Sequence, residues 1–255
     1  MTVGWLCESI RVTALWATPD DVSELLTWKS VIGADPEQRE TQPRIGTVRE
    51  VGPIWGGVAS LEFRASPGRA DWVVAPAIPP DIQLAGLPSL GEVEDIIQRF
   101  AALIIDAIAR SYSAPRFAFG LVALHPQPNR DASYGELIDL LRFAALTLEG
   151  ASDFSYQINR MRPSVAVSGL SINRLSRWAC VTFQGLRMQF SMSPAGSADG
   201  TVISNKSQPM FATRVEFDIN TAADWRETIP TAARKTLLDE LTGMSLELLE
   251  KGDIP

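Results

Sequence analysis

The apolar residues of this chain recur with the period of an α-helix in some stretches and with the period of a β-strand in others. After Ser89, they follow one another at intervals of three or four positions as far as Ile108, which predicts a helix with a broad buried face. In residues 61–64 and 214–219, apolar and polar residues alternate one by one, as in strands with one buried face. We therefore expect an α+β protein in which helices cover one face of a mostly antiparallel sheet.

The predicted elements occur twice in the same order: strand, helix, three strands, helix. In the first half they span residues 10–17, 19–31, 47–51, 57–65, 71–75 and 90–110. In the second half they span residues 116–125, 134–148, 154–162, 170–190 with a break, 211–219 and 229–251. This order predicts an internal duplication, with residues 1–113 and 114–255 as two α+β halves or as parts of one continuous domain.

Four sequence patterns are typical of helix starts. Ser89–Glu92 and Ser133–Glu136 fit capping boxes, in which a hydroxyl and a carboxylate each accept a hydrogen bond from a free backbone N–H. Thr18–Asp21 has proline at the first helical position and acids in the first turn, and Thr221–Asp224 has a similar polar start. We therefore expect helices to begin at all four places.

Positive charge is concentrated in residues 154–214. This segment holds six arginines and one lysine against the single acid Asp199, a net charge of +6. The whole chain carries −7, so the remaining residues sum to −13. A basic layer of this kind attracts an anionic ligand or pairs with acidic helices of the same protein. The negative net charge of the whole chain argues against DNA binding driven by the overall charge of the protein. A local basic patch still attracts anions within a Debye length of about 8–10 Å.

A repeated tetrapeptide lies inside the basic segment, Ile-Asn-Arg-Met at 158–161 and Ile-Asn-Arg-Leu at 172–175. If the two copies pair in a hairpin centred between residues 166 and 167, Asn159 lies opposite Arg174 and Arg160 lies opposite Asn173. Directly opposed residues point the same way, so this register predicts a single face made of Tyr156, Arg160, Arg162, Asn173 and Arg177.

These five residues are our candidate anion-binding site. Three guanidinium groups with an aromatic ring and an amide suit phosphates and bases, so the expected partner is nucleic acid or a nucleotide. The alternative is that the arginines pair with acids of the same chain, either on helices or on the strand that holds Glu216 and Asp218.

No catalytic, metal or cofactor pattern is present in the sequence. His125 is the only histidine, and it suits either a general base or a residue at a strand end. Cys180 lies in a strand pattern, and no CxxC spacing or phosphate-binding glycine loop occurs. Glu216 and Asp218 form a carboxylate pair that suits a hydrolase less well than it suits salt bridges. We therefore expect no catalytic residue, no metal site and no cofactor.

The last part of the chain resembles the end of a sporadically distributed prokaryotic family of uncharacterised proteins of similar length. The matching features are Arg214-Val-Glu-Phe-Asp-Ile-Asn-Thr221, Trp225, Ile229-Pro230, Leu241-Thr242 and Leu246-Glu-Leu-Leu-Glu250. Asn220 stands where that family commonly has an acid, and residues 236–238 stand where it commonly has aromatics. The resemblance implies no known activity, and the patchy distribution suits an accessory or defence gene.

The start of the chain lacks the pattern of a secretory signal, and the apolar stretch at 100–109 is interrupted by Asp106 and too short to span a bilayer. We therefore expect a cytoplasmic protein without membrane contact. The favoured function is non-catalytic binding of an anionic partner. The alternative is a protein–protein adaptor or an oligomeric scaffold that docks on an acidic protein, and the oligomeric state stays open.

Overall fold

The structure is a computed structural model, and it describes residues 4–16, 27–77, 86–111, 113–184, 186–189, 203–206 and 208–254. In Ser111 and in residues 186–189 and 203–206, only the backbone is described. Of the predicted helix at 19–31, residues 19–26 lie outside the described part of the chain, as does the predicted helix start at Thr18–Asp21.

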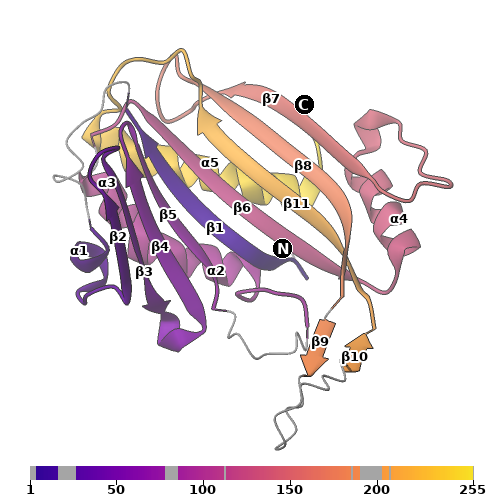
Figure 1. Cartoon of the computed structure of the whole chain (residues 1–255). Coiled ribbons are helices and arrows are strands. Elements are labelled where there is room, and N and C mark those ends of the chain that lie inside the picture. The colour runs from indigo at the N-terminus through magenta and orange to yellow at the C-terminus, as the bar shows by residue number, and fades with distance from the viewer. Residues whose placement is uncertain are drawn as a thin grey trace, which may run out of the picture.

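A nine-stranded antiparallel sheet runs through the molecule in the order β2-β3-β4-β5-β1-β6-β11-β8-β7 (Figure 1). Its strands are β1 (Leu6–Leu15), β2 (Gln38–Gln42), β3 (Thr47–Ile54), β4 (Ala59–Ser66), β5 (Arg69–Pro76), β6 (Arg116–Gln127), β7 (Ser155–Pro163), β8 (Ser171–Phe183) and β11 (Met210–Thr221). A separate antiparallel pair joins β9 (Leu186–Gln189) to β10 (Ile203–Lys206). The mostly antiparallel sheet predicted from the alternating strands is thus confirmed.

Helices pack on one face of this sheet. The segment 93–111 is continuous and consists of α2 (Val93–Phe100), a π-helical turn η3 (Ala101–Ile105) and α3 (Asp106–Ser111). The other helices are α1 (Trp28–Ile32), α4 (Arg130–Leu140) and α5 (Thr231–Lys251), and short 3₁₀ turns occur at η2 (Trp55–Gly57) and η4 (Arg142–Ala144). In Figure 1, α2 and α5 lie behind the sheet. We call this side the covered face, and the opposite side, on which no described helix lies, the open face.

The core fills the space between the covered face and the helices. Large side chains from alternate strand positions are fully buried there, among them Phe63, Trp72, Phe119, Trp178 and Phe217. Burying a side chain of this size stabilises a fold by roughly 1.5–3 kcal/mol. The helices contribute Ile96, Phe100, Ile104, Leu237, Leu241 and Leu248 to the same core. The helical and strand periods read from the sequence therefore correspond to the two layers of an α+β fold.

Strands β1 and β6 pair at the middle of the sheet, so residues 1–113 and 114–255 contribute to one sheet and one core. Moving outward from this central pair, the order is β1-β5-β4-β3 on one side and β6-β11-β8-β7 on the other, with β2 added at the outer edge of the first side. Among the described residues, no helix is long and apolar enough to cross a membrane.

Three predicted helix starts are wrong. Helix α4 begins four residues earlier than predicted, because Asn129 caps it by accepting a hydrogen bond from the backbone N–H of Ala132 at 2.8 Å. Ser133 lies inside that helix, where its buried hydroxyl contacts Thr213. Helix α2 has Glu92 at its N-cap position without a side-chain cap, and Thr221 ends β11, well before α5.

Candidate functional site

Strands β7 and β8 form the predicted antiparallel hairpin, but their register differs from the predicted one by one residue. Arg160 lies opposite Arg174, and Asn159 lies opposite Leu175. Ile172 and Trp178 are completely buried, so their set of alternate β8 side chains points into the core. The β7 residues opposite them, Arg162 and Tyr156, point to the same side. A slip of one residue moves one strand's side chains to the other face of the sheet.

The five predicted site residues therefore do not share a face, and that part of the prediction is wrong. Tyr156, Arg160 and Arg162 point to the covered face, whereas Asn173 and Arg177 point to the open face. The structure thus places the candidate anion-binding residues in two separate environments.

On the covered face, two of these arginines bind acids of the last helical segment. Arg160 donates from Nε and Nη2 to the two carboxylate oxygens of Asp253, at 2.7 and 2.8 Å. Arg162 donates to Glu247 in α5 at 2.6 Å. The hydrogen bonds to Asp253 raise the pKa of Arg160 despite the opposing effect of burial. Both arginines are therefore internally paired, as the alternative drawn from the sequence stated.

A third arginine of the covered face, Arg174, is almost fully buried. Its side chain makes one long hydrogen bond, from Nη1 to the carbonyl oxygen of Ile254 at 3.5 Å, while Nε and Nη2 have no hydrogen-bond partner in the described part of the chain. Burial lowers the pKa of Arg174, and the neighbouring charges of Arg162 and Arg160 lower it further. Arg174 is thus a buried charge with incomplete compensation.

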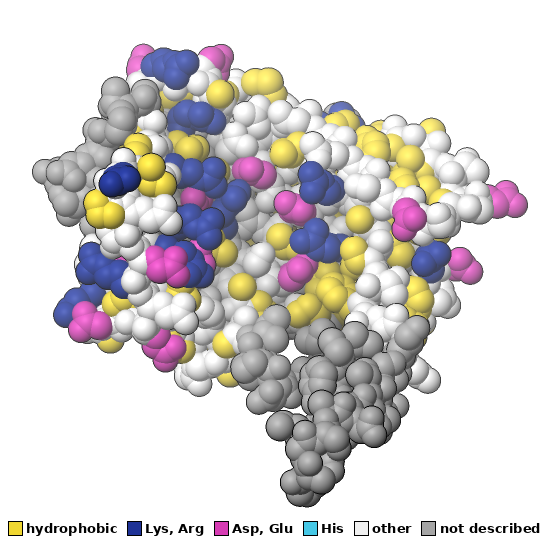
Figure 2. Space-filling view, viewed as in Figure 1, with side chains coloured by type: hydrophobic (Ala, Val, Ile, Leu, Met, Phe, Trp, Pro, Cys, Tyr) yellow, Lys and Arg dark blue, Asp and Glu magenta, His cyan; other side chains and the backbone are white. Residues whose placement is uncertain are grey.

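The open face carries one arginine from each of seven strands. Their positions follow from the strand registers, and they are Arg11, Arg49, Arg64, Arg69, Arg116, Arg177 and Arg214. Figure 2, which looks onto this face, shows dark blue side chains interleaved with magenta ones. Of these seven, only Arg177 was among the predicted site residues. Five of the other six lie outside the basic segment 154–214, and all of them become neighbours only when the strands assemble.

Most open-face arginines contact a carboxylate. Arg69 binds Asp71 through two hydrogen bonds of 2.6 and 2.9 Å, and Asp71 also accepts one from the hydroxyl of Thr13. Arg214 lies 2.7 Å from Glu8 and 3.3 Å from Glu216. The remaining pairs are Arg11–Asp218, Arg177–Glu216, Arg49–Glu62, Arg49–Glu40 and Arg64–Glu62. Glu216 and Asp218, the carboxylate pair noted in the sequence, thus serve in ion pairs with strand arginines.

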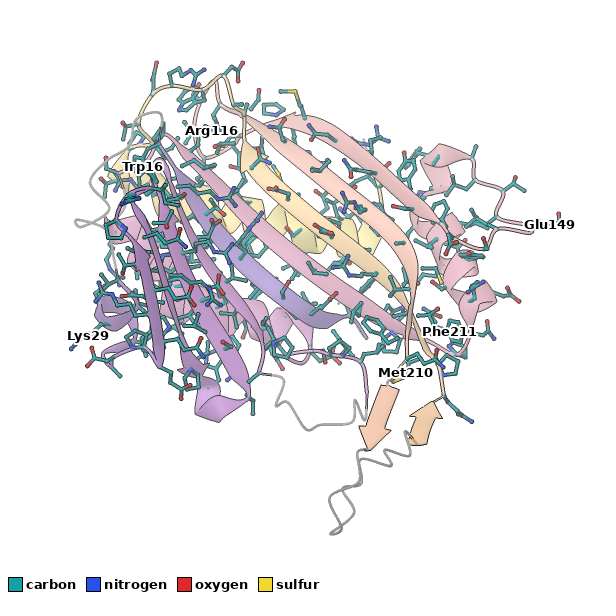
Figure 3. The ribbon with its side chains drawn as sticks, viewed as in Figure 1. Trp16, Lys29, Arg116, Glu149, Met210 and Phe211 are labelled. Atoms are coloured by element: carbon teal, nitrogen blue, oxygen red, sulfur yellow. The ribbon has the colours of Figure 1, made fainter. Side chains whose placement is uncertain are left out.

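Arg116 differs from the other open-face arginines. Among the described residues it makes no ion pair, and its Nε and Nη2 lie 3.4 Å from the carbonyl oxygen of Thr221. Partial burial lowers the pKa of Arg116, and the charge of Arg226 adds to this effect. Figure 3 shows Arg116 and Trp16 at the same end of the sheet.

A row of amides crosses three strands of the open face. Asn159 donates to Asn173 at 3.3 Å, Asn173 donates to Asn220 at 3.1 Å, and Asn220 donates to Asp218 at 3.2 Å. Asp218 also lies 3.4 Å from Arg11. This row therefore connects the outer strand β7 to the central strand β1 by polar side chains alone.

His125 holds the end of β6 against α4. Its Nδ1 lies 2.5 Å from Glu136, which also accepts a hydrogen bond from Gln127 at 2.7 Å. The hydrogen bond with Glu136 raises the pKa of His125, against the effect of burial. Thr213 lies opposite both His125 and Cys180, so two strand spacings, about 10 Å, separate the histidine from the cysteine. This separation is too long for a Cys–His catalytic pair.

The part of the chain that the structure describes contains no group of three His, Cys, Asp or Glu residues that could hold a metal ion. Comparison of the chain with protein-family models, with curated proteins and with solved structures found no match.

Proposed function

We propose that this chain is a non-catalytic binding protein whose open face receives an anionic partner, nucleic acid or a nucleotide. The observation that carries the proposal is the set of arginines that seven strands present on the open face, where no described helix lies. Guanidinium groups bind phosphates with two parallel hydrogen bonds, and the amides of Asn159, Asn173 and Asn220 offer donors and acceptors to base edges.

The open face suits this role better than the covered face. Arg160 and Arg162 are bound to Asp253 and Glu247, and Arg174 is buried beside them, so an incoming phosphate would have to displace the last helical segment. Of the residues first chosen from the sequence, Asn173 and Arg177 thus belong to the proposed surface. Tyr156, Arg160 and Arg162 do not.

The ion pairs of the open face do not prevent phosphate binding. The Arg177 and Glu216 side chains are 50% and 42% exposed, and exposed ion pairs of this kind contribute about 0–1 kcal/mol. Releasing Arg177 from Glu216 therefore costs at most about 1 kcal/mol. Arg116 has no described carboxylate to release, so we expect it to make the strongest single phosphate contact.

A second candidate function is a protein–protein adaptor or oligomeric scaffold. The observation in its favour is the regular mixture of both charge signs on the open face, as in Arg49, Glu62 and Arg64. A partner protein with a complementary mixture would pair with both signs, whereas a polyanion is repelled by the acids.

We also propose that the two halves arose by internal duplication within the prokaryotic family that the chain resembles, in an accessory or defence role. The matching outward strand orders, β1-β5-β4-β3 and β6-β11-β8-β7, support the duplication. A structural superposition of residues 6–111 on residues 116–251 tests it, and different helix placements in the two halves would contradict it.

Fluorescence anisotropy with labelled single- and double-stranded oligonucleotides, at low and physiological salt, tests the proposed function. Replacing Arg116 by Gln should weaken binding and lower the log–log salt slope by about 0.7–0.9, because each phosphate contact releases roughly one counterion. Replacing Arg130, an exposed arginine of α4 outside the sheet, is the matched control and should leave the slope unchanged. If no oligonucleotide binds at low salt while a protein partner is retained in a pull-down, the adaptor function replaces the proposal.

A further inference from the structure

A hollow of about 730 Å³ lies between the end of β3 and the middle of the helical segment 93–111. Its volume falls within the range of about 300–1,000 Å³ that ligand pockets usually have. The lining residues that matter here are Ile32, Pro53, Trp55, Arg99, Ala102 and Leu103. They come from α1, the β3–η2 junction and the helical segment, so the hollow is separate from the open-face arginines.

The backbone is irregular on both sides of this hollow. Trp55 has a φ of 54°, in the left-handed region that a bulky side chain rarely adopts, and such a conformation costs about 1–3 kcal/mol. Across the hollow, Ala102 and Leu103 belong to the π-helical turn η3, which interrupts the α-helical hydrogen bonding. Strained residues and π-helical turns are both frequent at functional sites. Here the two irregularities face the same space.

The strained tryptophan and the helix meet through a cation–π contact. The guanidinium carbon of Arg99 lies 4.1 Å from the centre of the Trp55 indole ring. Among the described residues Arg99 makes no ion pair with a carboxylate, in contrast to most arginines of the open face. The other named lining residues are apolar. The hollow therefore combines one aromatic surface, one cation and apolar walls.

We propose that this hollow binds a small carboxylate with a planar apolar body. The body would lie against the walls of Pro53, Ala102 and Leu103, next to the stacked Trp55 and Arg99 side chains, where its burial is favourable. The carboxylate would pair with Arg99, the one charged side chain among the described lining residues. A nucleic-acid strand does not fit this chemistry, because it would bring several phosphates to a single cation. The inference does not depend on the function proposed for the open face.

Isothermal titration calorimetry with 2-naphthoate and its neutral analogue 2-naphthamide tests the proposal. The wild-type chain should bind naphthoate about tenfold more tightly than naphthamide, a difference of about one charge-assisted hydrogen bond. Arg99→Gln should reduce naphthoate binding to the level of naphthamide and leave naphthamide binding unchanged. The matched control is Arg142→Gln, because Arg142 lies 5.3 Å from the ring of Phe143 in a similar contact outside the hollow. This control should change neither affinity.

Two further variants separate the hollow from other sites. Ala102→Trp should fill the hollow and abolish binding of both compounds. Leu103→Glu places a carboxylate in the wall and should weaken the binding of naphthoate more than that of naphthamide. This variant keeps the test decisive if circular dichroism shows that Ala102→Trp is misfolded. Absence of naphthoate binding to the wild-type chain, equal affinities for the two compounds, or full naphthoate binding by a folded Ala102→Trp variant would each overturn the proposal.

Discussion

Arg160 in β7 and Asp253, which follows α5, form a bidentate ion pair that holds the segment after α5 against the outer strand of the sheet. The oxygens of Asp253 lie 2.7 and 2.8 Å from the guanidinium nitrogens, and Asp253 is 1% exposed. The backbone N–H of Asp253 also donates to the carbonyl oxygen of Leu140. The pair therefore accounts for part of the charge separation seen in the sequence: a basic strand segment neutralised by the acidic C-terminal region.

Asp253→Asn should lower the free energy of unfolding by about 2–3 kcal/mol, because it removes a buried carboxylate and leaves Arg160 without its counter-charge. Urea unfolding followed by circular dichroism measures this change.

Arg174→Met should have the opposite effect and raise the free energy of unfolding by about 1–2 kcal/mol. The replacement removes a buried charge whose Nε and Nη2 have no described partner, and it keeps an apolar side chain of similar length in the core. If Arg174→Met instead lowers the free energy of unfolding as much as Asp253→Asn does, the charge of Arg174 is fully compensated by neighbouring groups in solution.

Gly252 is a position where alanine cannot fit. Its φ is 75°, and a Cβ there would lie 2.0 Å from the carbonyl oxygen of Leu140. Gly252→Ala should therefore destabilise the protein by more than about 2 kcal/mol and release the Arg160–Asp253 pair. Gly243→Ala is the control: it lies inside α5 with nothing near its Cβ, and it should stabilise by about 0.5–1 kcal/mol. Equal effects in thermal unfolding would contradict this reasoning.

The pair His125–Glu136 should make stability depend on pH. Its hydrogen bond raises the folded-state pKa of His125 above the ordinary value of 6.5. The stabilisation is fully present below that ordinary pKa and is lost as pH rises through the raised pKa of the folded state. Stability measured by urea unfolding should therefore fall across this window. The fall should disappear in His125→Gln, which removes the only histidine, and persistence of the same slope would assign it to another group.

The two cysteines should differ in their reactivity. Burial, with a further contribution from the charge of Glu8, raises the pKa of the Cys7 thiol to about 12, whereas Cys180 is partly exposed. Alkylation requires the thiolate, so iodoacetamide at pH 8 should label native protein once, at Cys180. Mass spectrometry of native and urea-unfolded protein checks this, with Cys180→Ser as the variant that should take no label until it unfolds.

Periodicity predicted most of the fold, because the buried faces of long elements leave a regular apolar pattern. The helix at 93–111, the final helix and the strands of the core follow that pattern. Strand β2 has no such pattern: every residue of Gln38–Gln42 is exposed, since the strand lies at the sheet edge. The start of α4 was missed because Asn129 and Ser133 both suit an N-cap, and the contact of Ser133 with Thr213 forms only in the folded chain.

The candidate site was less predictable than the fold. The repeated Ile-Asn-Arg motif correctly indicated that β7 pairs with β8. The true loop centre lies half a residue from the predicted one, and this shift places three of the five chosen side chains on one face and two on the other. Whether Arg160 meets a ligand or Asp253 depends on a contact across 93 residues. No local pattern reports such a contact. Arg116, the open-face arginine without a described ion pair, lies outside the basic segment, and no sequence motif around it indicates a binding role.

The position of β11 has a consequence for synthesis of the protein. This strand, Met210–Thr221, follows both β6 and β8 in the chain, yet it lies between them in the sheet and pairs with each. While the nascent chain is growing, β6 and β8 each have an edge of unpaired N–H and C=O groups that only β11 can cover. Because β11 lies between them, β6 and β8 can join into one sheet only after residues 210–221 have left the ribosome. Until then, these strand edges are exposed to pairing with neighbouring chains.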